Sequence, residues 1–164
     1  MNRPLVISFD LDGTLLCQGN GHLADPEIPV LMGPFGGRED RLRVGAAPLL
    51  RGLVEEGHTL WIYTQSLRGR SEVMGWFEGL GIALEGYVNL SLHERACEER
   101  GVVGRRPLKS PHWFGIEVHV DDDVTVEQEC RGSGCRVIVI RPDEVDFEGR
   151  VRKEIGDLIF EIGG

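Results

Sequence analysis

The sequence predicts a three-layer α/β/α fold in which one parallel β-sheet lies between two layers of helices. Short apolar runs typical of buried strands alternate along the chain with segments of helical periodicity, and acidic residues directly follow two of these runs. The carboxyl ends of parallel strands meet at one edge of such a sheet, where functional loops lie. At 164 residues, the chain fits a single domain, residues 1–164, with a hydrophobic core of its own.

The first strand is predicted over residues 5–9, because the apolar run Leu-Val-Ile-Ser-Phe leads into a turn that contains Gly13. Residues 17–44 then carry many Gly and Pro residues and show little helical periodicity. We interpret this segment as a short irregular insertion after the first strand, with a hairpin within it.

The middle of the chain alternates between helix and strand. A helix is predicted over residues 46–56, where four apolar side chains share one face and Gly57 follows, and a strand is predicted over residues 58–63. Residues 70–79 form the next amphipathic segment, and a weaker strand candidate covers residues 82–88. This alternation requires right-handed crossovers and a parallel sheet.

Two capping-box patterns indicate helices in the second half of the chain. Residues 91–94 predict a helix over 92–100, and residues 125–128 predict a short helix that ends near Gly132. Strands are predicted at the two remaining apolar runs and a helix at the end of the chain. These segments are residues 116–120, 136–140 and 147–160, and a loop over residues 101–111 precedes the first of them.

The segment from Asp10 to Thr14, with Asp12 and Gly13 inside it, places two carboxylates at the end of the first strand. Residues two apart in an extended backbone point the same way, so both acids can face one site. Carboxylates this close repel each other unless a cation, a basic side chain or a shared proton compensates. The motif therefore predicts a functional site.

Other polar residues follow the later strands or lie in loops beside them: Thr64, Gln65, Lys109, Asp121 and Asp122. A phosphate group needs hydrogen-bond donors, which the Thr64 hydroxyl, the Lys109 ammonium and a backbone amide near Gln65 can supply. In phosphoryl-transfer sites the phosphate also binds Mg²⁺, a cation that prefers oxygen ligands such as the carboxylates of Asp10 and Asp121. Together these residues indicate phosphoryl transfer.

The motifs follow one another in a set order: DxDGT, a strand that ends in Thr, a Lys and an acidic pair. With this order of motifs, the chain resembles the haloacid dehalogenase (HAD) superfamily over its whole length. The resemblance implies a Rossmann-like sheet and a phosphatase. It makes Asp10 the nucleophile that becomes an aspartyl phosphate, and Asp12 the general acid that then serves as base. An Asp at position 12 is typical of the phosphatase branch.

The resemblance also implies the ligands of the phosphate and of the metal. Thr64, Gln65 and Lys109 are the residues expected to bind the transferring phosphoryl group. Mg²⁺ is expected on Asp10, on Asp12 through its main-chain carbonyl, and on one or both of Asp121 and Asp122. Asp123 is interpreted instead as a helix cap, because it directly precedes a predicted helix.

Related enzymes take much of their substrate choice from a cap domain, for which residues 17–44 are too short. We therefore expect a minimal cap, with this segment as a flap over an open pocket. Such a pocket admits a phosphorylated small molecule or a phosphoprotein, or is covered by a second copy in a homo-oligomer. Four basic residues of the segment are candidates to meet an anionic substrate: His22, Arg38, Arg41 and Arg43.

Composition disfavours several classes of partner. A net charge of −9 opposes binding to a nucleic-acid backbone, and no apolar run approaches the roughly 20 residues that cross a bilayer. The four cysteines form no CxxC pair and the N-terminus has no long apolar stretch. We expect a protein of the cytoplasm, without membrane association.

Three alternative functions stay open at this point. A receiver-type phospho-acceptor domain uses similar residues, but in that family the Lys comes last, whereas here Lys109 precedes Asp121. A catalytically silent phosphate-binding scaffold could keep the same residues without turnover. The third alternative is a phosphotransferase of the same superfamily, which transfers the phosphoryl group to an acceptor other than water. A poorly covered site counts against it, because such a site admits water as the acceptor.

Overall fold

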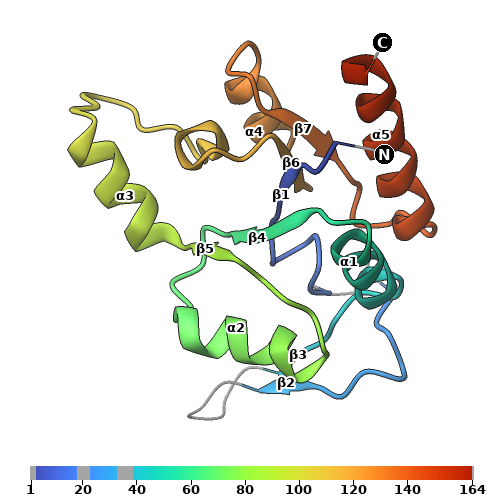
Figure 1. Cartoon of the computed structure of the whole chain (residues 1–164). Coiled ribbons are helices and arrows are strands. Elements are labelled where there is room, and N and C mark those ends of the chain that lie inside the picture. Colours follow the sequence, from blue (N-terminus) through green and yellow to red (C-terminus); the bar gives the residue numbers. More distant parts are fainter. Residues whose placement is uncertain (1–2, 18–22, 33–38, 164) are drawn as a thin grey trace.

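The structure is a computed structural model that describes residues 3–17, 23–32 and 39–163. Its centre is a five-stranded sheet in which all neighbouring strands run parallel, in the order β5-β4-β1-β6-β7 (Figure 1). The strands are β1 (Val6–Phe9), β4 (Thr59–Tyr63), β5 (Gly86–Val88), β6 (Val118–Asp121) and β7 (Arg136–Val139). The predicted α/β fold with a parallel sheet is confirmed.

Helices connect the strands and cover the sheet (Figure 1). They are α1 (Ala46–Glu55), α2 (Arg70–Gly79), α3 (Leu90–Glu99), the 3₁₀ helix η2 (Pro111–Phe114), α4 (Val124–Cys130) and α5 (Phe147–Gly163). None of the helices in the described ranges is both long and apolar enough to cross a membrane. The predicted hairpin is present as the two-stranded antiparallel pair β2 (Leu31–Met32) and β3 (Glu39–Asp40).

The sheet is buried on both faces, as its continuous apolar runs indicated. On one face, alternate strand residues such as Ile7 and Phe9 join side chains of α1 and α5, among them Leu50 and Val151, in the main hydrophobic core. On the other face lies a smaller hydrophobic cluster around Tyr63, and the Tyr63 ring also lies near the rings of the buried residues His93 and His119. The two faces therefore differ in chemistry.

Two predicted helix starts were wrong, because a residue before each capping-box pattern caps the helix instead. Helix α3 begins at Leu90, where the Asn89 side chain accepts a hydrogen bond from the Leu92 amide at 3.0 Å. Helix α4 begins at Val124, where Asp123 accepts from the Thr125 amide at 2.8 Å. The capping role expected for Asp123 is thus observed.

The strand candidate 82–88 is shorter than expected, since only residues 86–88 pair with β4.

Strand order places a crevice where function is expected. The chain runs from β1 to β4 and β5 on one side and then returns to β6 and β7 on the other, so the order reverses between β1 and β6. Ligands of open α/β sheets bind outside the carboxyl ends of strands at such a switch point. Asp10 follows β1 there, its amide donating to the Val120 carbonyl at 2.9 Å, and Asp121 ends β6 beside it.

Candidate active site

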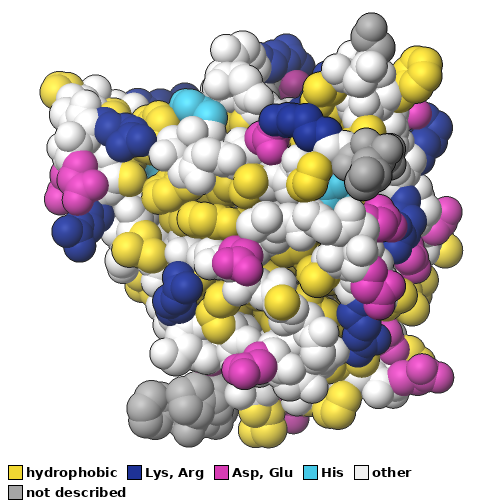
Figure 2. All heavy atoms as spheres, in the orientation of Figure 1, with side chains coloured by type: hydrophobic (Ala, Val, Ile, Leu, Met, Phe, Trp, Pro, Cys, Tyr) yellow, Lys and Arg dark blue, Asp and Glu magenta, His cyan; other side chains and the backbone are white. Residues whose placement is uncertain are grey.

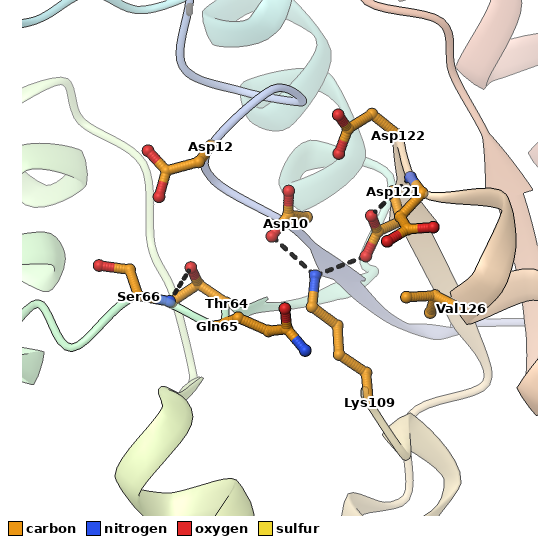
Figure 3. A pocket seen from close by; sticks show the side chains of 10 residues that line it. Asp10, Asp12, Thr64, Gln65, Ser66, Lys109, Asp121, Asp122 and Val126 are labelled. Carbon is orange, nitrogen blue, oxygen red and sulfur yellow. Dashed lines mark hydrogen bonds and ion pairs between the residues drawn. The ribbon is translucent and has the colours of Figure 1, made fainter. Parts of the chain in front are cut away.

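All seven residues predicted as catalytic residues, phosphate ligands or metal ligands lie around one cavity of about 280 Å³ at this edge of the sheet (Figure 3). Its walls are formed by Asp10, Asp12, Thr64, Gln65, Ser66, Lys109, Asp121, Asp122, Asp123 and Val126. They come from four segments that are far apart in the sequence. Parallel strands end together at this edge, which is why the segments meet.

Lys109 lies between two buried carboxylates. Its Nζ donates to Asp10 Oδ1 at 2.7 Å and also to Asp121 Oδ2, and all three residues are at most 5% exposed. Figure 3 shows the ammonium group pointing between the two acids. In this triad, Lys109 thus supplies the positive charge that Asp10 of the first motif required.

The two acids of the triad differ in their tendency to ionise. Burial raises the pKa of Asp10 to about 7, with Lys109 opposing the rise and Asp121 adding to it. Burial alone would also raise the pKa of Asp121, but Lys109 and His119 outweigh it and hold that pKa well below its usual range. The negative charge of the triad near neutral pH therefore resides mainly on Asp121, and further positive charge beside Asp10 would favour its ionisation.

A buried histidine fixes Asp121 from behind. His119 is fully buried on β6, and its Nε2 lies 2.7 Å from Asp121 Oδ2 while its Nδ1 lies 2.7 Å from the Ser8 hydroxyl. Burial lowers the pKa of His119, so the ring is neutral: Nε2 donates to Asp121, and Ser8 donates to Nδ1.

Three carboxylates form a donor set that fits Mg²⁺. Asp10, Asp121 and Asp122 each offer one oxygen, and these oxygens lie within 4.8 Å of one another. Hard oxygen donors of this kind, with room for water or phosphate, are what Mg²⁺ takes in phosphoryl-transfer sites. Burial, together with Asp121, raises the pKa of Asp122, which a cation would relieve. The Asp123 carboxylate is instead engaged in capping α4.

Gly13 makes this acidic arrangement sterically feasible. Its φ of +86° lies in the left-handed region, and a Cβ there would collide with the Asp122 carboxylate. Glycine therefore allows both the sharp turn after β1 and the close approach of Asp122.

Gly13→Ala is expected to lower the free energy of unfolding by about 1–2 kcal/mol, from left-handed strain, and to weaken Mg²⁺ binding by displacing Asp122. Gly57→Ala is the matched control, because Gly57 has a φ of +90° with no atom within 4 Å of the added Cβ. The measurement is the rise in melting temperature caused by MgCl₂. An equal rise in both variants would contradict this role of Gly13.

The loop that carries Lys109 is anchored by a buried polar chain. The Ser110 amide donates to the Tyr63 hydroxyl at 3.0 Å, and that hydroxyl lies 2.6 Å from His93 Nδ1. His93 Nε2 in turn lies 2.8 Å from the Pro107 carbonyl. A loop without regular structure thus holds the lysine in a fixed place.

The other two predicted phosphate ligands face the same cavity. Thr64 Oγ1 accepts the Ser66 amide at 3.0 Å, so its hydroxyl hydrogen can point elsewhere, as a phosphate donor requires. The Gln65 side chain donates to the Leu108 carbonyl at 2.9 Å, which ties the end of β4 to the lysine loop.

Arg68 is a site residue that the sequence analysis missed. Its guanidinium makes a bidentate ion pair with Asp12, at 2.7 and 3.0 Å, and also bonds the two oxygens of Asp40 on β3, at 3.0 and 3.1 Å. The sequence held only a weak signal, an arginine shortly after the strand that ends at Thr64. Its partners lie 56 and 28 residues away, so only the fold brings them together.

Arg43, predicted as a candidate to meet an anionic substrate, is buried, and the prediction was wrong. It is 1% exposed, donates to the carbonyls of Thr14, Arg141 and Glu144, and lies over the Phe147 ring.

Among the other three candidates, Arg41 is exposed and lines no part of the cavity. The other two candidates, His22 and Arg38, lie outside the described residues. No described residue of 17–44 forms a cavity wall, and Asp40 connects this segment to the site.

No family model matches the sequence, and no curated protein matches it. Several solved structures do. D,D-heptose 1,7-bisphosphate phosphatase from B. bronchiseptica, complexed with magnesium and phosphate, aligns with 14% identity over 93% of this chain and 86% of its own, with a TM-score of 0.53. 3-Deoxy-D-manno-octulosonate 8-phosphate phosphatase from Moraxella catarrhalis aligns with 19% identity over 96% and 86%, with a TM-score of 0.48.

Two structures of the Pnkp1/Rnl/Hen1 complex, one of them described as an RNA repair complex, align with 15% identity over 84% of this chain. Their TM-scores are 0.50 and 0.54. The chain spans less than half of the matched chain in these complexes, 42% and 46% of its length. At these identities the likeness demonstrates a shared fold, which agrees with the Rossmann-like architecture expected from the motifs.

Proposed function

We propose that this chain is a phosphohydrolase of the HAD superfamily, which cleaves a phosphate monoester through an aspartyl phosphate with the help of Mg²⁺. The observation that carries the proposal is the buried triad of Asp10, Lys109 and Asp121, which lies beside Asp122 in a polar cavity at the switch point of the sheet. The heptose bisphosphate phosphatase of the same fold, complexed with magnesium and phosphate, supports this assignment.

Asp10 is the nucleophile. One of its carboxylate oxygens forms a bond to phosphorus while the bond from phosphorus to the leaving oxygen breaks, and the electron pair of that bond stays on the leaving oxygen. Thr14 donates to Asp10 Oδ2 at 3.2 Å and Lys109 to Oδ1, so both oxygens are oriented before the substrate arrives. Lys109 and the Thr64 hydroxyl then bind the phosphoryl oxygens.

Asp12 moves the protons of both steps. In its protonated form it gives a proton to the leaving oxygen, and the resulting carboxylate then takes one from the water that attacks the aspartyl phosphate. The second step regenerates Asp10, releases inorganic phosphate and leaves Asp12 protonated for the next cycle; the ion pair with Arg68 belongs to the carboxylate form. Mg²⁺, held by Asp10, Asp121, Asp122 and the Asp12 carbonyl, would neutralise charge on the phosphoryl oxygens.

The proposed substrate is a phosphorylated small molecule, with a phosphoprotein as the second class. On the face drawn in Figure 2, basic side chains lie scattered among acidic ones, and the net charge is −9, neither of which favours a nucleic-acid backbone. Residues 17–44 as a flap over the pocket remain part of the proposal. The open pocket either admits a larger substrate or is covered by a second copy of the chain.

The test is a hydrolysis screen with MgCl₂ or with EDTA over sugar phosphates, phosphopeptides and a 3′-phosphorylated oligonucleotide. Release of phosphate that requires both MgCl₂ and Asp10 is the expected result. Turnover that survives chelation or the change Asp10→Asn would overturn the mechanism. Each alternative has its own outcome: phosphate binding without turnover indicates a scaffold, a long-lived phosphoenzyme a receiver-type domain, and transfer to an alcohol a phosphotransferase.

A further inference from the structure

The side chain of Arg68 joins Asp12 to the β2–β3 hairpin. Nη1 donates to Asp12 Oδ2, and Nη2 is shared between Asp12 Oδ1 and the carboxylate of Asp40 on β3. The Arg68 and Asp40 side chains are 10% and 5% exposed, so the pairing is shielded from solvent. A bidentate guanidinium–carboxylate pair fixes direction as well as distance.

Arg68 is itself held in place on several sides. Its carbonyl accepts hydrogen bonds from the Tyr87 hydroxyl and from Asn89 Nδ2. Its guanidinium lies 5.9 Å from the centroid of the Trp76 ring, and Trp76 Nε1 donates to the Met32 carbonyl on β2 at 3.2 Å. Arg68 is therefore part of a connection between α2 and the β2–β3 hairpin. An arginine at a solvated surface would not have these contacts.

The orientation of Asp12 follows from this contact. Figure 3 shows the Asp12 carboxylate turned away from Asp10 and Lys109. In an in-line displacement the leaving oxygen lies on the side of phosphorus opposite to the attacking Asp10, and a proton donor must come within about 3 Å of it. The direction in which Asp12 points thus decides whether the leaving oxygen receives its proton as the phosphorus–oxygen bond breaks.

We propose that Arg68 is the positioning residue of this site, which sets the orientation of Asp12, and that its bond to Asp40 makes this orientation depend on the β2–β3 hairpin. The inference rests on the proposed function. Arg68 acts through Asp12, and Asp40 acts through Arg68, so neither needs to touch the reacting atoms.

The proposal predicts a dependence on the leaving group. An alkyl phosphate expels a strongly basic alkoxide and needs the proton of Asp12, whereas 2,4-dinitrophenyl phosphate expels a weakly basic phenolate and does not. The quantity to compare is kcat/KM, because it reports phosphoryl transfer to Asp10 and excludes the later hydrolysis of the phosphoenzyme. A role of Arg68 in folding alone would lower kcat/KM equally for both substrates.

The experiment compares Arg68→Met, Arg68→Lys, Asp40→Asn and Asp12→Asn on dinitrophenyl, p-nitrophenyl and alkyl phosphates. For Arg68→Met we expect about a 100-fold loss in kcat/KM on the alkyl ester and less than about tenfold on the dinitrophenyl ester, the pattern of Asp12→Asn. Arg68→Lys should recover part of the loss, and Asp40→Asn should lie between. Arg51→Met, which removes an exposed guanidinium bonded only to the Leu80 carbonyl among the hydrogen bonds described, should match the wild type.

A loss that is the same for all three esters would refute the positioning role. A second measurement is independent of turnover: in a crystal structure of Arg68→Met, the Asp12 carboxylate should take a different direction, and an unchanged direction refutes the inference. If the wild type hydrolyses no phosphate ester in an Asp10-dependent way, the proposed function fails, and the direction of Asp12 in the variant still decides the role of Arg68.

Discussion

Asp10→Asn is expected to abolish turnover while leaving the metal-free protein more stable than the wild type. Loss of the nucleophile removes the covalent step, for which we expect a decrease in kcat on the order of 10⁴-fold or more. The fold should survive, because Lys109 keeps its ion pair with Asp121 and an amide of nearly the same shape replaces the carboxylate. Steady-state hydrolysis and thermal unfolding in EDTA measure the two effects.

The gain in stability has a pH dependence with a defined sign. Burial raises the pKa of Asp10 to about 7 in the folded protein, from 3.8, so the folded state binds an additional proton between these values. The stability that this group contributes is present below about pH 4 and is lost as the pH rises through about 7. Asparagine has no such proton to lose, so its advantage should grow from pH 4 to pH 8, to on the order of 2–4 kcal/mol.

Asp157→Asn is the control for this result, since Asp157 is exposed and pairs with Lys153 on the surface of α5. Its melting temperature should follow that of the wild type at every pH. An Asp10→Asn variant that is less stable than the wild type at pH 8 in EDTA would show that the ionised carboxylate stabilises the empty site, contrary to this account.

Lys109→Met is expected to be the most destabilising single change in the site. It leaves Asp10 and Asp121 buried without their cation, and removing one partner of a buried ion pair costs about 3–5 kcal/mol. The loss should shrink as the pH falls, because Asp10 then takes up a proton and the repulsion disappears. Hydrolysis should also fall, since the phosphoryl oxygens lose their fixed positive charge.

The double variant Lys109→Met with Asp10→Asn separates charge from packing. If uncompensated charge is the cause, the second change should restore much of the lost stability, and urea unfolding at pH 8 should show a large coupling between the two positions. Additive effects of the two changes would mean that Lys109 stabilises the protein by packing alone. MgCl₂ should also restore part of the stability of the single variant, because it supplies positive charge to the same acids.

Local patterns in the sequence were enough to predict the layers of the fold and the chemistry of the site. Strand and helix periodicity extend over consecutive residues, so β1 and α2 could be recognised without any knowledge of distant segments. Asp10 and Asp121 could be assigned to one edge because parallel strands end together, whatever the packing around them. Residue type then limited what such a site can bind.

The tertiary structure decided what depends on pairing between distant segments. Arg43 and Arg68 are both arginines in weakly patterned stretches, yet one is buried against backbone carbonyls and the other pairs with Asp12. The sequence by itself determined which chemical groups the chain carries and on which strands. Which partner each charge meets was decided only by the fold, because that partner lies many residues away and packing alone brings it near.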